Sequence, residues 1–239
     1  TFVPKQVISI AGGIYNSGEV GVETTYKNRT SMAANSSSMF AFFVNASDEI
    51  IYYRSTSTDF LVFSDANVAI SPPVDPTTGE IEIIGSEIDA SSTLHLAYYH
   101  KYNNTSTDQL MYASSSDLGL NWTTSTIDMN LEGSEGGNIL SPSNLADFAL
   151  DTNNLPGIVY TKVDGYVSPG ATTTISFAKK TSAGAWVTST VDSLVYDNNF
   201  QYKGFLKPKL SFFSSENYAL ISYVELDSNN YPTFANDMT

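Results

Sequence analysis

The sequence contains no cysteine, so it can form no disulfide and offers no thiolate nucleophile. It is also poor in positive charge, with 11 Lys and Arg against 25 Asp and Glu and a formal net charge of −14. Nucleic acids and anionic membrane surfaces are bound by basic patches. The sequence therefore predicts no nucleic-acid partner and no membrane insertion.

Long apolar runs are missing as well, because no stretch approaches the roughly 18 residues of a membrane-spanning helix. Histidine is scarce, and neither His95 nor His100 belongs to a cluster with the spacing of a metal site. Phosphate-binding loops, dinucleotide fingerprints and nucleophile elbows are absent. We predict no cofactor, with Ca²⁺ bound by loop carbonyls and Asp as the open alternative.

Aromatic and β-branched residues are abundant instead. Aromatics make up 13% of the 239 residues, with 15 Tyr and 13 Phe. These residue types favour strands, and no segment shows a helical period. The composition predicts an all-β domain that is long enough to bury one large core.

The chain repeats itself with a period near 60 residues. The spacings are 55, 62 and 63 residues in one strand and 59, 65 and 57 in the next. The first series is Phe43, Tyr98, Tyr160 and Tyr223, and the second is Tyr53, Tyr112, Phe177 and Phe234. Two outer strands beginning at Trp122 and Trp186 read Trp-Thr-Thr-Ser-Thr-Ile-Asp and Trp-Val-Thr-Ser-Thr-Val-Asp. Each unit also has a preceding strand, which gives four strands, A to D.

Repeated four-stranded antiparallel units of this length are typical of β-propeller blades. We expect a single propeller domain over residues 1–239. Its blades are predicted near 29–63, 81–128, 143–192 and 207–239, with segment 3–11 completing the last one. Closure into four blades, an arc of a larger ring and a dimer of two arcs all stay open.

The segment from Ser115 to Trp122 reads Ser-x-Asp-x-Gly-x-x-Trp. It resembles the Asp-box of the sialidase-like (BNR-repeat) β-propeller superfamily, in which the box is a structural turn on the side away from the active site. The resemblance implies a structural role for Ser115, Asp117, Gly119 and Trp122. Asp accepts main-chain hydrogen bonds, Gly permits a positive φ, and Trp packs between sheets. Related stretches are Ser55–Phe60 and the shortened Ser182, Gly184 and Trp186.

The resemblance does not extend to the residues of sialidase catalysis. Sialidases hold the substrate carboxylate with three Arg, whereas this sequence has only Arg29 and Arg54. Lysine is a poor substitute at such a bidentate site. We therefore do not expect sialidase activity.

The D–A loops, at about 12–28, 64–79, 129–143 and 193–208, are long, and they share one face with the B–C loops. Binding residues concentrate on long loops carried by a rigid scaffold. We predict a ligand site there, formed by Tyr15, Tyr26, His100, Tyr102, Tyr166, Tyr196, Tyr202 and Lys203.

A glycoside hydrolase would need two carboxylates near the axis. The catalytic candidates in that case are Glu132, Glu135 and Asp147, with Glu87 and Asp89 also considered. Asp89 and Asp151 occupy equivalent positions of the repeat, which favours a turn role for both. His95 lies among apolar residues and is predicted to be a core residue.

The leading hypothesis is a non-catalytic extracellular or cell-surface module that binds a glycan or a protein. A secreted glycoside hydrolase or lyase and a purely structural assembly module remain alternatives. Six glycosylation sequons permit the extracellular location without proving it, at Asn28, Asn35, Asn45, Asn103, Asn104 and Asn121. The start at Thr1 without a signal peptide leads us to expect a processed chain or part of a larger one. Oligomers also remain open.

Overall fold

The computed structural model describes residues 30–45, 50–57, 64–71, 79–102, 108–129, 131, 145–164, 172–195, 203–213 and 218–227. Every regular element within these ranges is a β-strand. The strands form three four-stranded sheets and one two-stranded sheet, in which neighbours in sequence pair antiparallel. This confirms the all-β propeller fold with repeated four-stranded units.

Each sheet follows the order of the chain from its inner to its outer strand. The first sheet holds β1 (Thr30–Ala34), β2 (Ser38–Asn45), β3 (Ile50–Ser57) and β4 (Asn67–Ile70). The second holds β5 (Gly79–Ile88), β6 (Leu94–Tyr102), β7 (Gln109–Ser115) and β8 (Thr123–Met129). The third holds β9 (Ala146–Leu150), β10 (Pro156–Asp164), β11 (Thr172–Lys180) and β12 (Trp186–Val195). The fourth holds β13 (Lys203–Phe212) and β14 (Ala219–Asp227).

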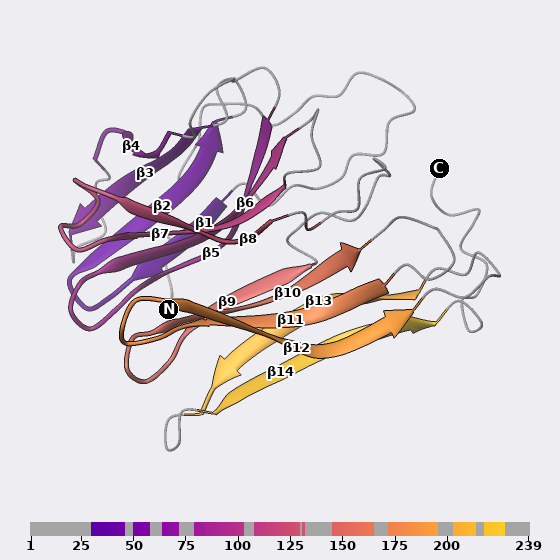
Figure 1. Ribbon diagram of the computed structural model, residues 1–239. Coiled ribbons are helices and arrows are strands. Elements are labelled where there is room, and N and C mark those ends of the chain that lie inside the picture. The colour runs from indigo at the N-terminus through magenta and orange to yellow at the C-terminus, as the bar shows by residue number, and fades with distance from the viewer. Residues whose placement is uncertain are drawn as a thin grey trace, which may run out of the picture.

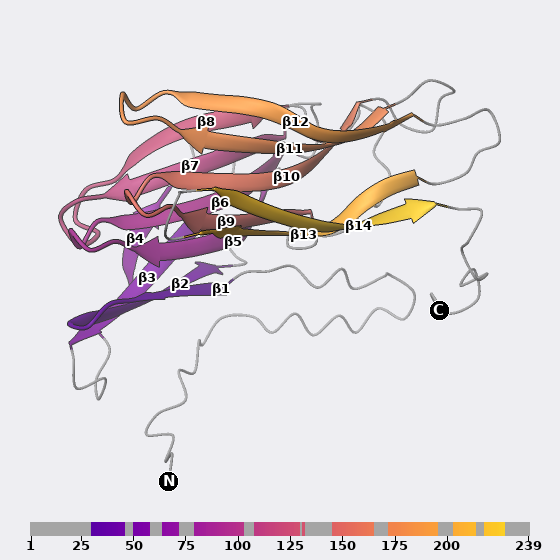
Figure 2. The ribbon, with the colours of Figure 1, turned by 90° about the horizontal axis from the view of Figure 1, so that it is seen from below.

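The sheets are arranged as a fan around their first strands, because β1, β5, β9 and β13 contact one another in succession. Figure 1 shows the first sheet in indigo at one end of this arc and β13 and β14 in yellow at the other. In the view from below, β8 and β12 lie along one edge of the fan and β5, β9 and β13 lie away from it (Figure 2).

Apolar side chains from consecutive sheets form the core in three layers. Alternation along each strand sends one set of side chains to the preceding sheet and the other to the following sheet. Phe42, Ile51 and Ile83 lie in the first layer, between sheets one and two. Tyr112 and Ile158 belong to the second layer, between sheets two and three. Val159 and Phe205 belong to the third, between sheets three and four.

The outer strand of each complete sheet carries a β-bulge at the same position of the repeat. The register shifts between Ile51 and Tyr52, between Leu110 and Met111, and between Ile175 and Ser176. In the second sheet Leu110 pairs with Asp128, while Met111 pairs with Thr126. One residue of the outer strand is left without a partner on the neighbouring strand, so the side-chain alternation reverses at that point.

Three sequence-based placements need correction. The predicted loop at 64–79 contains strand β4, which pairs with β3. Residues 55–57, taken as part of an Asp-box-like turn, belong to β3. The predicted loop at 193–208 holds the end of β12 and the start of β13. The proposed closing segment 3–11 and the third strand of the last unit lie outside the described residues.

Candidate functional site

The sheets have two distinct ends. We call the end where Tyr102, Met129, Asp164 and Val195 lie the loop end, because strands there lead into the D–A and B–C connections. The opposite end, the turn end, holds the tight connections at 35–37, 89–93, 116–122, 151–155 and 181–185. Figure 1 shows these tight connections gathered at the left of the molecule.

Most predicted ligand residues lie outside the described ranges, namely Tyr15, Tyr26, Tyr166, Tyr196 and Tyr202. The same is true of the catalytic candidates Glu132 and Glu135. Tyr102 is the last residue of β6 and Lys203 the first of β13, so the backbone of both belongs to strands at the loop end. The binding role of these residues stays a prediction.

His100 was placed in a loop, and this placement is wrong. It pairs with Ile81 and Gln109 within the second sheet, and its side chain is buried. Burial lowers the pKa of its imidazole. His100 follows Tyr98 by two residues in β6, so strand alternation directs both toward the first sheet.

A polar contact that the sequence analysis missed joins the second and third sheets near the loop end. The hydroxyl of Tyr160 donates to Asp128 Oδ2 over 2.8 Å. Lys162 Nζ lies 3.2 Å from Asp128 Oδ1 in an ion pair that is about a quarter exposed. Burial raises the pKa of the Tyr160 hydroxyl, and the hydrogen bond to the charged Asp128 raises it further.

The same contact recurs one repeat later, between the third and fourth sheets. Tyr223 donates to Asp192 Oδ2 over 2.8 Å, and this hydrogen bond is the main cause of its raised pKa. The two Asp residues end the two near-identical seven-residue stretches that begin at Trp122 and Trp186. This repetition of Asp128 and Asp192 was the sequence signal from which the contacts could have been found. We call the contacts Tyr160–Asp128 and Tyr223–Asp192 the Asp–Tyr latches.

Asp147, the described catalytic candidate, also binds the following sheet. Its carboxylate accepts a hydrogen bond from the backbone N–H of Leu210 at 2.9 Å. Lys209 Nζ lies 3.2 Å from its Oδ1. Asp147 thus ties β9 to β13 at the point where the register of β13 and β14 shifts.

Among the described residues, Glu87 is the carboxyl group nearest in character to a catalytic acid. It lies in β5, next to the strand of Asp147. Burial raises its pKa, and the negative charge of Asp147 raises it further. A carboxyl group with a raised pKa beside a second carboxyl group is the pattern that glycosidases use for acid catalysis.

At the turn end, the segment from Ser115 to Trp122 has the hydrogen bonds of a closed turn. Asp117 Oδ1 accepts from the backbone N–H of Asn121 and from the Ser115 hydroxyl, each at 2.8 Å. The Asn121 side chain donates to Asp117 Oδ2 over 2.7 Å. The Asn121 side-chain bond, then its backbone bond and that of Ser115, lower the pKa of Asp117 to about 2.

This turn is docked on the first sheet. Gly119 has a φ of +95°, and a Cβ placed there would lie 2.6 Å from Cζ of Tyr53. The Trp122 indole meets the ring of Phe42 edge-on, with centroids 5.9 Å apart. Its Nε1–H donates to the carbonyl of Gly119 over 3.0 Å.

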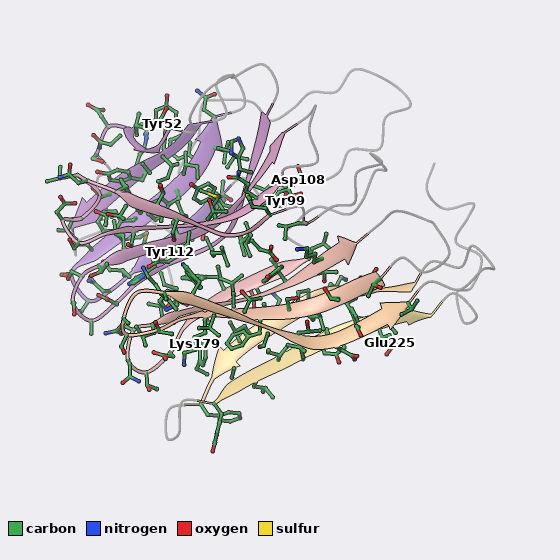
Figure 3. The ribbon with its side chains drawn as sticks, in the orientation of Figure 1. Tyr52, Tyr99, Asp108, Tyr112, Lys179 and Glu225 are labelled. Carbon is green, nitrogen blue, oxygen red and sulfur yellow. The ribbon has the colours of Figure 1, made fainter. Side chains whose placement is uncertain are left out.

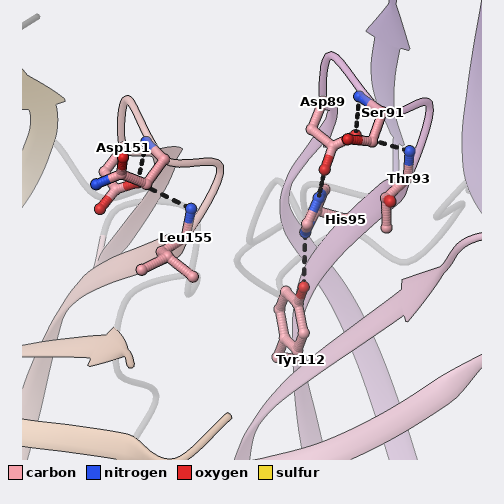
Figure 4. Close-up of polar contacts among 8 residues, drawn as sticks. Asp89, Ser91, Thr93, His95, Tyr112, Asp151 and Leu155 are labelled. Carbon is pink, nitrogen blue, oxygen red and sulfur yellow. Dashed lines mark hydrogen bonds and ion pairs between the residues drawn. The ribbon is translucent and has the colours of Figure 1, made fainter. Parts of the chain in front are cut away.

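The A–B turns repeat one arrangement of hydrogen bonds (Figure 4). Asp89 Oδ1 accepts from the backbone N–H groups of Ser91 and Thr93, each at 2.8 Å. Asp151 Oδ1 accepts in the same way from Asn153 and Leu155, at 2.7 and 2.9 Å. The predicted turn role of both Asp residues is confirmed.

Beyond this shared turn, the second sheet has a buried polar chain. Asp89 Oδ2 lies 3.3 Å from His95 Nε2, and His95 Nδ1 lies 2.6 Å from the Tyr112 hydroxyl. Since a carboxylate only accepts, His95 Nε2–H donates to Asp89, and in the neutral form of the imidazole the Tyr112 hydroxyl donates to Nδ1. Burial lowers the pKa of His95, against the opposing effect of Asp89. Burial raises the pKa of Tyr112 to about 12.

The side chains around Tyr112 come from the third sheet. Trp186 meets its ring edge-on at 5.3 Å between centroids, and Lys180 Nζ lies 4.7 Å from its ring centroid. Figure 3 shows Tyr112 and Lys179 toward the turn end, whereas Tyr99, Asp108 and Glu225 lie toward the loop end. The Asp89–His95–Tyr112 chain therefore lies in a filled inter-sheet layer.

Among the described residues, no three His, Cys, Asp or Glu side chains are placed to hold a metal ion. Within the same ranges, no helix is long and apolar enough to cross a membrane. Arg54 lies in β3, and Arg29 lies outside the described residues.

Comparisons with known proteins identify the fold. No protein-family model and no curated protein matches the sequence. A Hadza microbial sialidase, Hz136, superposes with a TM-score of 0.53 at 9% identity, over 85% of this chain and 44% of that protein. The chain thus spans less than half the length of that sialidase.

Two further solved structures are similar at lower scores. A NanB sialidase mutant from Streptococcus pneumoniae has a TM-score of 0.44 at 11% identity, covering 83% of this chain and 27% of that one. A thermostable family-43 glycoside hydrolase has a TM-score of 0.45 at 12% identity, covering 86% and 73%. The repeated sheets and the superposition on Hz136 show a sialidase-like propeller fold.

Proposed function

We propose that this chain is a non-catalytic, extracellular or cell-surface propeller module that binds a glycan or a protein at its loop end. The observation that carries the proposal is the state of three carboxylates near that end. Asp128, Asp147 and Asp192 each accept hydrogen bonds from the sheet that follows. Their role is to hold the sheets together.

Glycoside hydrolysis needs a different arrangement. One carboxyl group must donate a proton to the leaving group while a second acts on the sugar or on water. Asp128, Asp147 and Asp192 already accept hydrogen bonds from Tyr, Lys or backbone N–H donors of the next sheet, so their carboxylates are engaged in contacts between sheets. The scarcity of arginine, with two in the whole sequence, also speaks against sialidase chemistry.

The rigid sheets support a binding surface at the loop end because they fix the strand ends from which the connections emerge. Aromatic faces with hydroxyl and amide groups suit sugar recognition, and Tyr is also enriched in protein-binding surfaces. The proposed ligand residues are those of the sequence analysis, with Tyr102 and Tyr202 as the first to test.

A glycan array, screened with and without Ca²⁺ and followed by calorimetry, tests the proposal. We expect saturable binding that is lost in Tyr202→Ala or Tyr102→Ala and is accompanied by no turnover. Tyr218→Ala is the matched control, because Tyr218 is an exposed tyrosine at the turn end. A folded protein that binds neither glycans nor any protein on an extracellular-protein array would overturn the proposal.

A hydrolase is the second candidate, and the carboxyl groups of Glu87 and Asp147 favour it, because the charge of Asp147 contributes to the raised pKa of Glu87. Aryl glycosides would report its turnover directly. Turnover that is lost in Glu87→Gln and Asp147→Asn, while the folded state is kept, would replace the binding proposal with the catalytic one. Turnover that survives both changes would direct attention to Glu132 and Glu135.

A further inference from the structure

Lys207 has a backbone conformation that is unusual for a residue inside a strand. Its φ is +50°, in the left-handed region that a residue with a Cβ enters at a cost in free energy. Among the described residues, the other non-glycine residues with a positive φ lie in tight connections, namely Ser92, Leu118 and Asn154. Pro208 follows Lys207, and a residue before proline ordinarily takes an extended conformation. The chain therefore keeps a lysine at a position where glycine would relieve strain.

Lys207 lies at a β-bulge of β13, where the register against β14 shifts between Leu206 and Lys209. A bulge at the same position of the repeat lies in β5, between Ile83 and Gly85. The residue of β5 equivalent to Lys207 is Ile83, which is fully buried. Bulges redirect side chains and are frequent beside functional sites. The fourth sheet thus exposes a lysine at a bulge where the second sheet buries an isoleucine.

Lys207 also differs from the other lysines in its contacts. Within the described part of the chain, its side chain is exposed and has no carboxylate or hydrogen-bond partner. Four other lysines are engaged, three in ion pairs with Asp and one over the ring of Tyr112, and these are Lys162, Lys179, Lys209 and Lys180. Strained backbone is retained mostly where a side chain has a function. An exposed ammonium without a partner, held by such a backbone, suits the binding of an anion.

The charges around Lys207 are more favourable to an anion than those of the first two sheets. Of the described residues up to Leu131, eight are acidic and two are basic, whereas from Leu145 onward there are six of each. Strand β13 contributes three of these six lysines and contains no acidic residue. Lys209 is 66% exposed and contacts Asp147 through one oxygen, so its ammonium keeps N–H groups for a ligand.

We propose that Lys207 binds a sulfate ester group of a glycan, with Lys209 as a second donor. This ligand class presupposes the binding function proposed above and specifies its chemistry. Lysine binds a tetrahedral anion as a point charge, whereas a carboxylate is bound best by the planar fork of arginine. The described residues of the third and fourth sheets include no arginine. The lysines of β13 therefore fit a sulfate better than a carboxylate.

The position of Lys207 is compatible with a ligand held at the loop end. Lys203, at the loop end, precedes Lys207 by four residues of β13, which corresponds to a rise of about 13 Å. An oligosaccharide of a few sugars spans this distance. One glycan can therefore contact the loop end with its sugar rings and Lys207 with its sulfate.

An array of neutral, carboxylated and sulfated glycans, followed by calorimetry with each hit, tests the ligand class. We expect saturable binding of sulfated glycans, loss of binding when the same glycan lacks its sulfate, and weaker binding as sodium chloride is raised. Hits restricted to neutral or carboxylated glycans, or to proteins, would overturn the sulfate assignment and leave the proposed binding function standing. The absence of any hit would overturn both.

Substitutions at Lys207 separate a binding role from a structural one. Lys207→Gly removes the ammonium and suits the positive φ. It should keep or raise the melting temperature while weakening binding of the sulfated hit about tenfold or more. Lys207→Arg keeps the charge and should bind nearly as well as the wild type. Val187→Glu is the matched control, because it lowers the net charge by the same amount at an exposed residue of β12 and should leave binding unchanged.

Two results with Lys207→Gly would reject the assignment. A lower melting temperature would show that the ammonium stabilises the fold through a partner in the same chain. Unchanged affinity for the sulfated hit would show that the sulfate is bound elsewhere. Loss of binding in Tyr202→Ala or Tyr102→Ala together with unchanged binding in Lys207→Gly would support the loop-end site and remove Lys207 from it.

Discussion

The turns that follow β7 and β11 occupy the same place in consecutive sheets and differ in how they are held. The turn of the second sheet has the full set of Asp117 hydrogen bonds, and its Gly119 rests on Tyr53 of the first sheet. In the third sheet, Thr181 Oγ1 accepts from the N–H of Ala185, and nothing lies within 4 Å of a Cβ at Gly184. Both glycines have a positive φ. The turn at this position of the repeat is therefore a docking element in one sheet and a shorter, undocked reversal in the next.

The largest contrast is expected from alanine at the two glycines. Gly119→Ala adds backbone strain and a clash with Tyr53, and should lower the free energy of unfolding by about 3 kcal/mol. Gly184→Ala adds only the strain and should cost about 1 kcal/mol. Urea denaturation measures both. Equal losses would show that the contact with Tyr53 contributes nothing.

The next contrast concerns the two Asp–Tyr latches. Tyr160→Phe removes a hydrogen bond from a buried hydroxyl to a carboxylate and should cost about 2 kcal/mol. Tyr223→Phe removes the equivalent bond at a more exposed site and should cost about 1 kcal/mol. Chemical denaturation again provides the measurement. If Tyr160→Phe leaves the free energy of unfolding unchanged, the Asp128–Tyr160 contact does not contribute to joining sheets two and three.

A smaller contrast lies in the pH dependence of the two A–B turns. The pKa of His95 is lowered from 6.5 by burial, so the unfolded chain takes up a proton before the folded chain does. Stability present above pH 6.5 is therefore lost as the pH falls through the lowered pKa. In the third sheet Asp151 pairs with Lys179 at 2.7 Å, and both histidines of the sequence lie in β6 of the second sheet.

His95→Gln should accordingly flatten the fall in melting temperature below pH 6.5, leaving the part due to His100, whose pKa is lowered in the same direction. Lys179→Gln is the control and should keep the full pH dependence. If both variants follow the wild-type profile, the imidazole of His95 is already protonated in the folded state or is accessible to water.

The smallest effect is expected from the exposed carboxylate of the Asp-box. Its pKa is lowered from 3.8 to about 2. The contribution of Asp117 to the free energy of unfolding is therefore present above pH 3.8 and is lost as the pH falls toward 2. Asp117→Asn should remove this fall in the free energy of unfolding at low pH. Above pH 5, the free energy of unfolding of the variant should change with pH in parallel with that of the wild type. Thr181→Ala, in the corresponding turn, should leave the slope intact. A slope that persists in Asp117→Asn would falsify the assignment.

The period of the sequence was sufficient to predict the strands wherever aromatic markers recur. Tyr98 and Tyr160 both lie in second strands, and Trp186 begins the outer strand β12. Strand β4 was missed because the first unit has no Trp and no complete Asp-box to mark its outer strand. A strand is predicted from the alternation of apolar and polar residues, and the four residues of β4 are too few to show it.

The contacts between sheets were harder to predict. The repeated Asp128 and Asp192 are visible in the sequence, but their partners Tyr160 and Tyr223 lie 32 and 31 residues away on another sheet. Which faces meet depends on the twist of the fan and on the bulges, which a single sequence does not encode locally. The ligand residues at the loop end depend on connections that have no repeating pattern.

The bulge in each outer strand has a consequence for which sequence changes the protein tolerates. Trp122 contacts the preceding sheet and Asp128, six residues later, contacts the following one. Residues an even number apart on a regular strand point the same way, so the unpaired residue between them is what reverses the direction. Trp186 and Asp192 are related in the same way. The segments 122–129 and 186–195 thus each connect three consecutive sheets, and the count of residues between Trp and Asp matters more than their identity. Substitutions between the Trp and the Asp are therefore expected to be tolerated. An insertion or deletion of one residue would instead point the carboxylate toward the wrong sheet.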